Sequence, residues 1–252
     1  MSAALKPVPS MSDAEWQARC DLAALYRVVH HMNWTDLINT HMSARVLDHP
    51  GHFLINRYGQ TFDEITASSL IKMDYDGNVI GETGKFNNAG FTIHSAVLRG
   101  CAEANFVMHT HTRAGAGVSM LKNGLRPISQ DHMQVLDDVA YHEYGVPATQ
   151  EECEEVMKSS RHGSCIVLEN HGLLTHGPNV HGAFMRMYML ERACELEVIS
   201  RQMNAPVVHI SADVQQKYAE RMKKRRSTPE YGLMEWEGLV RTIEREGADF
   251  RR

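Results

Sequence analysis

The stretch VMHTHTRAGAGVSM, residues 107–120, decides how the rest of this chain is interpreted. It holds His109 and His111 two positions apart, after the apolar run 104–108 and before small residues at 114–117. Residues i and i+2 of a β-strand point to the same face, so the two imidazoles are expected side by side at a strand end. Two imidazoles in that arrangement, next to a glycine-rich turn, suit a divalent metal.

A second motif supplies the third expected ligand. Residues 167–177 read VLENHGLLTHG, with His171 between an apolar strand and a glycine. Three neutral imidazoles, with positions left open for water or substrate, describe a catalytic metal site and not a structural one. The alternative is that these histidines, in a chain with 15 His, are ordinary buried polar residues.

Composition limits the class of protein. The chain has 252 residues, 43% of them hydrophobic, which suits one domain with one substantial core. A net charge of -5 argues against a general nucleic-acid or acidic-membrane surface. There is no apolar run of about 18 residues and no secretory signal, so no membrane span is expected. The 5 Cys are scattered without a CxxC, which fits reduced thiols and a cytoplasmic protein.

The pattern of apolar residues predicts the elements of the fold. We expect a flexible N-terminal arm over residues 1–12 and one domain over residues 13–252. Helical periodicity predicts helices at 13–32, 92–99, 112–121, 150–160, 180–203, 211–226 and 231–246. Strands are predicted at 43–46, 53–56, 71–75, 105–109, 139–144 and 164–168. Hairpin signals mixed with helices predict an α/β fold with a central, largely antiparallel sheet and helices on both sides.

Three segments together resemble the class II aldolase/adducin family: HTHTRAGAGVS, NHGLLTHG and NNAGFTIHSAVLR. The resemblance runs from Asp21 to Arg201, most of the chain. It implies an α/β domain, commonly in a homotetramer with active sites between subunits. It also implies that His109, His111 and His171 hold one divalent metal ion per subunit, usually zinc, with manganese or iron(II) as alternatives.

The sequence departs from the sugar-phosphate aldolases of this family at two places. Those enzymes carry a Ser-Ser-Glu segment whose Glu is the acid/base, whereas here Gly90 stands at the Glu position of Asn-Ala-Gly. Their phosphate-binding Gly-Asn-x-Ser turn corresponds here to Thr-His-Met-Ser, residues 40–43. The segment resembles the adducin-like bacterial branch, which includes metal-dependent decarboxylases of aromatic or heteroaromatic acids and some iron(II) oxygenases.

Another side chain must then supply the proton. The resemblance points to His41, in the phosphate-turn position, and to His132, in SQDHMQV; a structural hydrogen bond is the alternative role for each. His94 is either a partner behind the site or a packing residue. Candidate substrate contacts are the amides of Asn87 and Asn88, which otherwise shape a turn, and the guanidinium of Arg113, which otherwise forms a surface ion pair.

The end of the chain carries one more candidate. Tyr231 lies where related aldolases bring a C-terminal tyrosine from a neighbouring subunit. The helix predicted after it repeats large apolar residues at helical spacing, including Trp236 and Ile243. That helix either folds back on its own domain or packs on a neighbour and carries Tyr231 to the neighbour's metal.

The predicted function is a metal-dependent lyase that breaks a C–C bond, as a decarboxylase or retro-aldolase. The expected substrate is a small carbonyl compound or hydroxy-acid without phosphate, aromatic acids included. An iron(II)-dependent oxygenase and a non-catalytic, adducin-like interaction domain are the alternatives. We expect no nucleic-acid or membrane partner, and a homotetramer of this chain.

Overall fold

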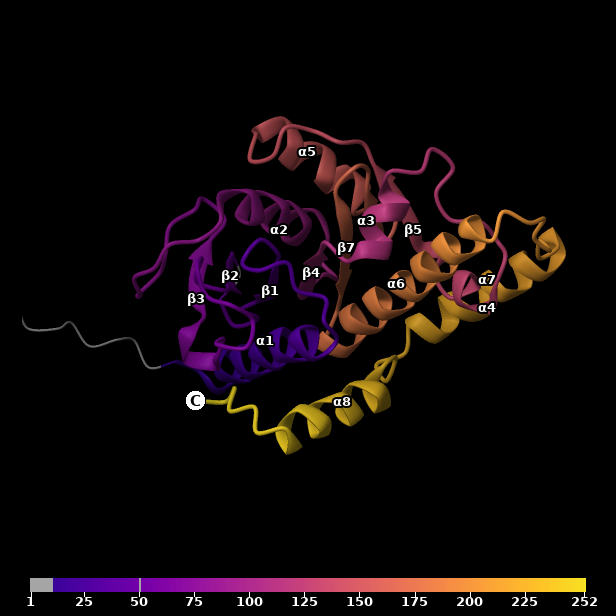
Figure 1. Ribbon diagram of the computed structural model, residues 1–252. Helices are drawn as coiled ribbons and strands as arrows, with labels where there is room; N and C mark the ends of the chain where they lie inside the picture. Colours follow the sequence, from indigo (N-terminus) through magenta and orange to yellow (C-terminus); the bar gives the residue numbers. More distant parts are fainter. Residues whose placement is uncertain (1–10, 50) are drawn as a thin grey trace, which may run out of the picture.

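The computed structural model describes residues 11–49 and 51–252, so residues 1–10 of the expected arm lie outside the described part. A seven-stranded sheet has the order β3-β2-β1-β4-β7-β6-β5 (Figure 1). Strands β5 and β6 are parallel, and the other neighbours are antiparallel. The strands are β1 (His41–Arg45), β2 (His52–Ile55), β3 (Ile71–Asp74), β4 (Phe106–Thr110), β5 (Val139–His142), β6 (Cys165–Leu168) and β7 (Gly172–Gly177).

Helices cover both faces of this sheet, which confirms the predicted α/β architecture. Successive residues of β4 point to opposite faces of the sheet. Met108 packs with α1 and α6 on one face, and Val107 packs with α2 and α5 on the other. The helices are α1 (Asp13–His31), α2 (Asn88–Gly100), α3 (Arg113–Ser119), α4 (Gln130–Met133), α5 (Gln150–Ser159), α6 (Val180–Gln202), α7 (Ala212–Arg226) and α8 (Leu233–Arg245), with 3-10 turns η1 (Ala67–Ser69) and η2 (Leu136–Asp138). None of the helices in the described ranges is long and apolar enough to cross a membrane.

The structure adds elements that the pattern of residues does not predict. The segment after His171, where no strand is predicted, forms β7, a central strand between β4 and β6. All of its residues are buried, so it lacks the alternation that identifies a half-exposed strand. Helix α2 begins at Asn88, four residues before the predicted start, because the Asn87 side chain caps it. The short helix α4 is also absent from the prediction.

The topology brings three separate segments to one end of the sheet. Strand β1 runs antiparallel to β4, and His41 at its start is paired with His109 near the end of β4. Strand β7 also runs antiparallel to β4, so its first residues meet Thr110. The turn between β6 and β7, which contains His171, therefore lies beside the end of β4.

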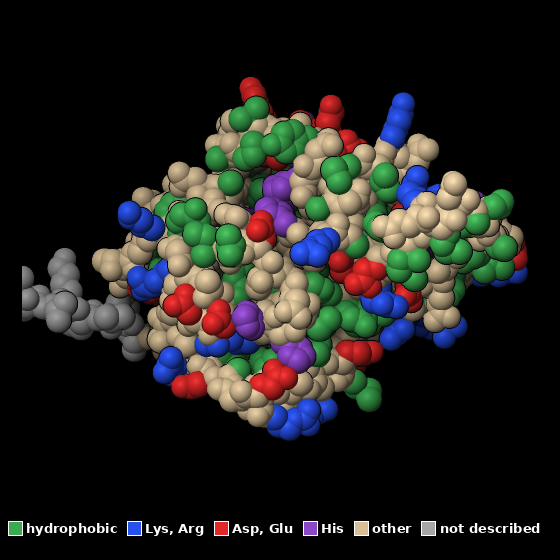
Figure 2. All heavy atoms as spheres, in the orientation of Figure 1, with side chains coloured by type: hydrophobic (Ala, Val, Ile, Leu, Met, Phe, Trp, Pro, Cys, Tyr) green, Lys and Arg blue, Asp and Glu red, His purple; other side chains and the backbone are tan. Residues whose placement is uncertain are grey.

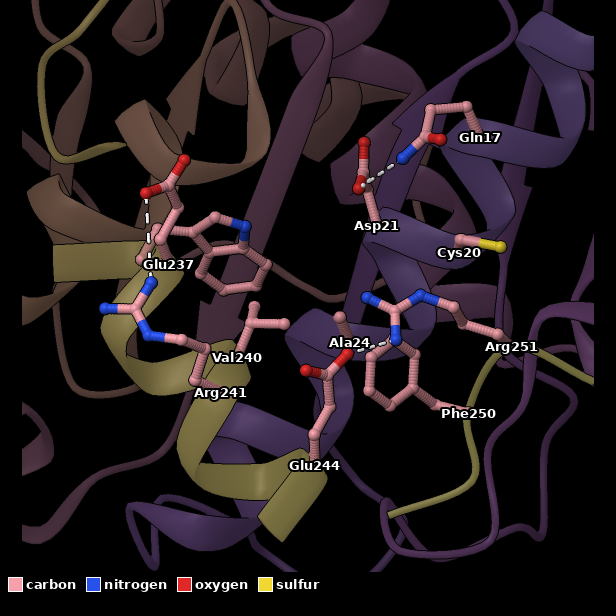
Figure 3. Close-up of a pocket in the computed structure, with 11 residues that line it drawn as sticks. Gln17, Cys20, Asp21, Ala24, Glu237, Val240, Arg241, Glu244, Phe250 and Arg251 are labelled. Atoms are coloured by element: carbon pink, nitrogen blue, oxygen red, sulfur yellow. Dashed lines mark hydrogen bonds and ion pairs between the residues drawn. The ribbon is translucent and has the colours of Figure 1, made fainter. Parts of the chain in front are cut away.

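The C-terminal segment folds back on its own domain. Helix α8 packs against α1 and α6, and Trp236, Ile243 and Phe250 are buried in the main core. The backbone of Ala67 donates to the Phe250 carbonyl. A cavity of about 210 Å³ remains between α1, α8 and this segment, where Figure 3 shows the Glu244 carboxylate and the Arg251 guanidinium facing each other. This cavity is built from other elements than those that carry the paired histidines.

Candidate metal centre

Three imidazoles from two segments meet at the sheet end. His109 lies in β4, His111 directly follows that strand, and His171 lies in the β6–β7 turn. Each offers one ring nitrogen, and these atoms all lie within 4.8 Å of one another. The ring of His171 is 4.7 Å from that of His109 and 4.9 Å from that of His111, between centroids. The expected ligand set is therefore brought together.

Hydrogen bonds fix which nitrogen of each paired histidine is free. His109 Nδ1 donates to the Leu173 carbonyl at 3.0 Å, and His111 Nδ1 donates to the Asp36 carboxylate at 2.8 Å. A carbonyl and a carboxylate only accept, so both Nε2 atoms carry lone pairs. These two Nε2 atoms lie 2.9 Å apart. Lone pairs that face each other so closely repel, and a cation bound by both removes the repulsion, so the donor set fits a divalent metal.

Burial keeps these rings in the form that binds metal. Burial lowers the pKa of His171 to about 4, and it lowers the pKa of His109 well below its usual value. The neighbouring imidazoles act in the same direction, because a second positive charge close by is unfavourable. Both rings are therefore neutral at neutral pH, as a metal ligand must be.

The glycine after His171 is required by close packing. A Cβ on Gly172 would lie 2.5 Å from the Thr110 carbonyl oxygen and 3.1 Å from His111 Cδ2. Asn170, just before His171, adopts the left-handed region with φ 56°, which asparagine tolerates better than most residues. Its backbone N–H donates to the Ser119 carbonyl at 2.9 Å. The NHG motif thus forms a tight turn against β4 and the end of α3.

A fourth imidazole, His41, lies beside the three. Its ring centroid is 5.1 Å from that of His109. Its Nδ1 is 2.8 Å from His94 Nε2, and His94 Nδ1 is 2.5 Å from the Ser43 hydroxyl. A Cβ on Gly90 would lie 2.7 Å from His41 Nε2, so only glycine leaves room for this ring. The structure therefore brings His41 next to the paired histidines and makes His94 its partner.

His132 belongs to a different cluster. It is fully buried, with Nδ1 2.8 Å from the Ser129 hydroxyl and Nε2 3.3 Å from Glu197 Oε2. Arg126 and Arg201 bind the same Glu197 carboxylate. These contacts tie α4 to α6, and none of them involves a histidine of the metal centre. His132 has the structural hydrogen bond that was its alternative role.

Tyr231 lies at the opposite end of the sheet in its own subunit. Its ring packs under the Arg186 guanidinium, which pairs with Asp138. Asp138 accepts from the backbone of Ser164, just before β6, whereas His171 follows the other end of β6. The Tyr231 hydroxyl is buried without a hydrogen-bond partner among the described residues. The isolated subunit therefore does not bring Tyr231 to its own histidines.

The expected substrate contacts border the centre. The Asn87 side-chain oxygen accepts from the backbone of Ala89 and Gly90, so it caps α2. Asn88 is exposed at the start of that helix. Arg113, two residues after His111, is exposed and forms no ion pair within the described part of the chain. Its guanidinium is free to meet an anionic ligand.

Sequence reasoning missed two neighbours of the centre. Asp36 orients His111 from a loop 75 residues away in the chain, and no motif marks it. Tyr144, 55% exposed, places its ring 6.5 Å from that of His171, although the residue was assigned only to a strand end. In Figure 2, histidine side chains reach the surface beside an acidic side chain, between groups of hydrophobic side chains.

This chain is similar to known proteins along nearly its whole length. Residues 20–198 match the family described as Class II Aldolase and Adducin N-terminal domain. An aldolase II superfamily protein from Pseudomonas syringae is 40% identical, with a TM-score of 0.91 over 96% of this chain and 98% of that one. The L-fuculose 1-phosphate aldolase from Glaciozyma antarctica is 25% identical, with a TM-score of 0.81 over 98% and 97%. Alpha-adducin of Mus musculus is 42% identical over 185 residues, which are 71% of this chain and 25% of adducin.

Proposed function

The chain belongs to the class II aldolase/adducin family, and we propose that it is a metal-dependent lyase that breaks a C–C bond in an oxo- or hydroxy-acid without phosphate. One observation carries the proposal. The Nε2 atoms of His109 and His111 face each other at 2.9 Å while Leu173 and Asp36 hold their other nitrogens. An interaction domain without catalysis has no need of such a set.

Three imidazoles leave coordination positions open and bring no negative charge. A divalent metal held by them, with zinc as the first choice and manganese or iron(II) as the others, supplies Lewis-acid polarisation of a carbonyl or hydroxy-carboxylate. Decarboxylation and retro-aldol cleavage both need such an electron sink. Arg113, exposed and free of ion pairs among the described residues, is suited to bind a carboxylate of the substrate. Asn88 is suited to donate an amide hydrogen to a second oxygen.

His41 is the side chain that we propose moves the proton. Its ring fills the space beside Gly90, where the sugar-phosphate aldolases carry their glutamate. The ring lies 5.1 Å from that of His109, and its Nε2 has no hydrogen-bond partner among the described residues. His41 thus stands in for the carboxylate at nearly the same place.

The same two positions argue against a sugar phosphate as substrate. The Thr40 and His41 side chains are buried, and the ring of His41 is turned towards Gly90 and His94. A phosphate dianion without the Gly-Asn turn loses charge-assisted hydrogen bonds worth about 1.5–3 kcal/mol each. We therefore expect a substrate that differs from that named for the Glaciozyma antarctica enzyme.

We also propose a homotetramer in the cytoplasm, with the metal centre near a subunit boundary. Exposed apolar side chains occur in the segments that contact the centre: Leu37 follows Asp36, Met120 follows Ser119, and the Tyr144 ring lies beside that of His171. A patch of this kind on a single subunit favours contact with another protein surface or an apolar ligand. The cysteines are free thiols, in keeping with a reducing compartment. Light scattering that finds a monomer at micromolar concentration would refute the tetramer.

The test is metal analysis followed by a substrate screen. Protein purified without added metal is analysed for zinc, manganese and iron. It is then incubated with hydroxy-aromatic acids, oxo-acids and sugar 1-phosphates, with and without oxygen. The proposal requires metal-dependent release of carbon dioxide or an aldehyde without oxygen. Turnover that consumes oxygen indicates the iron(II) oxygenase, and metal without any turnover indicates an adducin-like domain. Cleavage of a sugar 1-phosphate far above every acid contradicts the substrate class.

A further inference from the structure

We propose that Ser43 and His94 are positioning residues that hold His41 as a hydrogen-bond donor, with its proton on Nε2, so that the site selects a ligand oxyanion. The chain of contacts runs from a strand hydroxyl through two rings to the space above Gly90. The inference about the ligand rests on the proposed function, whereas the position of the proton is a property of the protein alone.

The three side chains form a closed, buried series. Ser43 and His94 are 0% and 0% exposed, and His41 is 3% exposed. The Ser43 hydroxyl lies 2.5 Å from His94 Nδ1, and His94 Nε2 lies 2.8 Å from His41 Nδ1. Both nitrogens of His94 are thus engaged, while His41 Nε2 remains for a ligand. Neither ring contacts a carboxylate among the described residues, so nothing in this buried series favours a charged imidazole, and burial lowers the pKa of His94 to about 3.

The direction of the hydrogen bonds follows from Ser43. Its hydroxyl hydrogen has no acceptor other than His94 Nδ1 among the residues that the structure describes. A buried hydroxyl hydrogen without an acceptor is unfavourable, so Ser43 donates to His94. A neutral His94 that accepts at Nδ1 carries its proton on Nε2 and donates to His41 Nδ1. A neutral His41 that accepts at Nδ1 must then carry its own proton on Nε2.

Reversing the hydrogen bonds, so that His41 donates to His94 and His94 to Ser43, is unfavourable for two reasons. It would leave the Ser43 hydroxyl hydrogen without an acceptor. It would also leave a bare Nε2 lone pair on the His41 ring, which lies 5.1 Å between centroids from the ring of His109, whose own Nε2 already faces that of His111 at 2.9 Å. An N–H at this place complements its surroundings, because it can share an anionic oxygen with a bound cation.

A proton on His41 Nε2 favours one class of ligand. An N–H donor beside the three imidazoles favours a ligand with an anionic oxygen close to the atoms that chelate the metal. A carboxylate adjacent to a carbonyl or hydroxyl has this pattern. A neutral sugar hydroxyl, which needs an acceptor for its own hydrogen, fits less well because the Ser43–His94 series keeps the His41 lone pair on Nδ1 occupied.

Neutron diffraction of the deuterated, zinc-loaded protein locates the protons. Deuterium on Nε2 of both His41 and His94, and none on His41 Nδ1, is the expected result. Deuterium on His41 Nδ1 would overturn the proposal. This measurement needs no turnover, so a failed substrate screen refutes the proposed function and leaves this result standing.

Oxalate, a dianion that chelates metals through two oxygens, tests the consequence in solution. Titration calorimetry on zinc-loaded Ser43→Ala should show binding at least about threefold weaker than for the unmodified protein, with equal zinc content, because the tautomer of His94 is released. Ser43→Thr keeps the hydroxyl and should restore the affinity. Ser95→Ala is the matched control: Ser95 is equally buried, on the same helix as His94, and donates only to the Thr92 carbonyl. Unchanged oxalate affinity in Ser43→Ala contradicts the proposal.

Discussion

The His41 ring fills the space that a side chain at position 90 would need. A Cβ on Gly90 would lie 2.6 Å from His41 Cδ2 and 2.7 Å from Nε2, closer than atoms of a folded protein approach. A glutamate at position 90 therefore excludes the histidine at position 41. The two departures from the sugar-phosphate aldolases, which lie far apart in the sequence, are one physical change: a carboxylate is exchanged for an imidazole beside the same three histidines.

Gly90→Ala should destabilise the protein by about 1–3 kcal/mol, because the new methyl group overlaps the buried His41 ring. His41→Gly in the same chain should recover most of that loss, since it removes the ring that the methyl group meets. Chemical denaturation of the single and double variants gives the coupling energy. Strictly additive effects would show that the two residues do not compete for space.

Substituting any one of His109, His111 and His171 by Ala should abolish stoichiometric metal binding while the fold persists. A three-nitrogen set cannot hold the ion tightly with two. Elemental analysis after dialysis measures the content, and circular dichroism checks the fold. His209→Ala, at an exposed position, is the control and should keep full metal. Metal at full occupancy in the triple variant would remove the site from consideration.

Asp36→Ala should weaken metal binding about 10–100-fold, because His111 loses the acceptor that holds its proton on Nδ1. Asp36→Asn still offers an oxygen to that N–H, so its metal affinity should lie between those of Asp36→Ala and the unmodified protein. Competition with a chelating dye measures the affinity. Asp213→Asn removes an exposed carboxylate on α7 and should change nothing. Equal affinity in Asp36→Ala and the unmodified protein would mean that the Asp36 contact has no part in metal binding.

Glu191 gives a pH dependence with a defined sign. It is 4% exposed and accepts from the Thr112 hydroxyl at 2.5 Å, and burial raises its pKa to about 7 from a usual value near 4.5. Between these values the folded state binds more protons than the unfolded state, so this residue lowers stability as pH rises from about 4.5 to 7. Glu191→Gln should therefore stabilise the protein by about 1–3 kcal/mol at pH 8 and little at pH 4.

Denaturation curves at the two pH values, on metal-free protein, measure this difference. Glu195→Gln, on the same helix but only partly buried, is the control and should show no comparable change. A gain in Glu191→Gln that is the same at both pH values would mean that the carboxyl does not titrate in this range.

The ligand set was predictable because it is local. The HxH pair and the NHG turn place their imidazoles by strand alternation and by one tight turn, and the structure keeps both. The amphipathic helix α8 was predictable for the same reason, from its apolar residues repeated at helical spacing. Strand β7 was not, because a central strand buried on both faces shows no alternation.

The partners of the centre depend on contacts that no local pattern encodes. Asp36 reaches His111 from a loop, and His94 reaches His41 from a helix across the sheet. His132 shows the converse: a histidine near the expected position in the sequence turns instead to Glu197. Residue type and spacing identify atoms that bind a metal, whereas packing decides which other side chains orient them.

The C-terminal segment contributes to the core of its own subunit. If α8 were only an interface element, deleting residues 228–252 would leave a folded domain in a smaller assembly. The structure predicts another outcome, because Trp236, Ile243 and Phe250 are 6%, 2% and 2% exposed in the subunit's own core. Burial of each such side chain stabilises a fold by about 1.5–3 kcal/mol, so their joint loss approaches the stability of a whole domain.

We therefore expect the truncated chain to lose its cooperative unfolding transition, and Trp236→Ala alone to cost about 3–5 kcal/mol. Met234→Ala, two residues away on the same helix and 82% exposed, is the matched control and should leave stability unchanged. Thermal unfolding followed by circular dichroism, together with light scattering, separates the two accounts. A truncated protein that still unfolds cooperatively near the original temperature, but as a smaller assembly, would return α8 to the role of an interface between subunits.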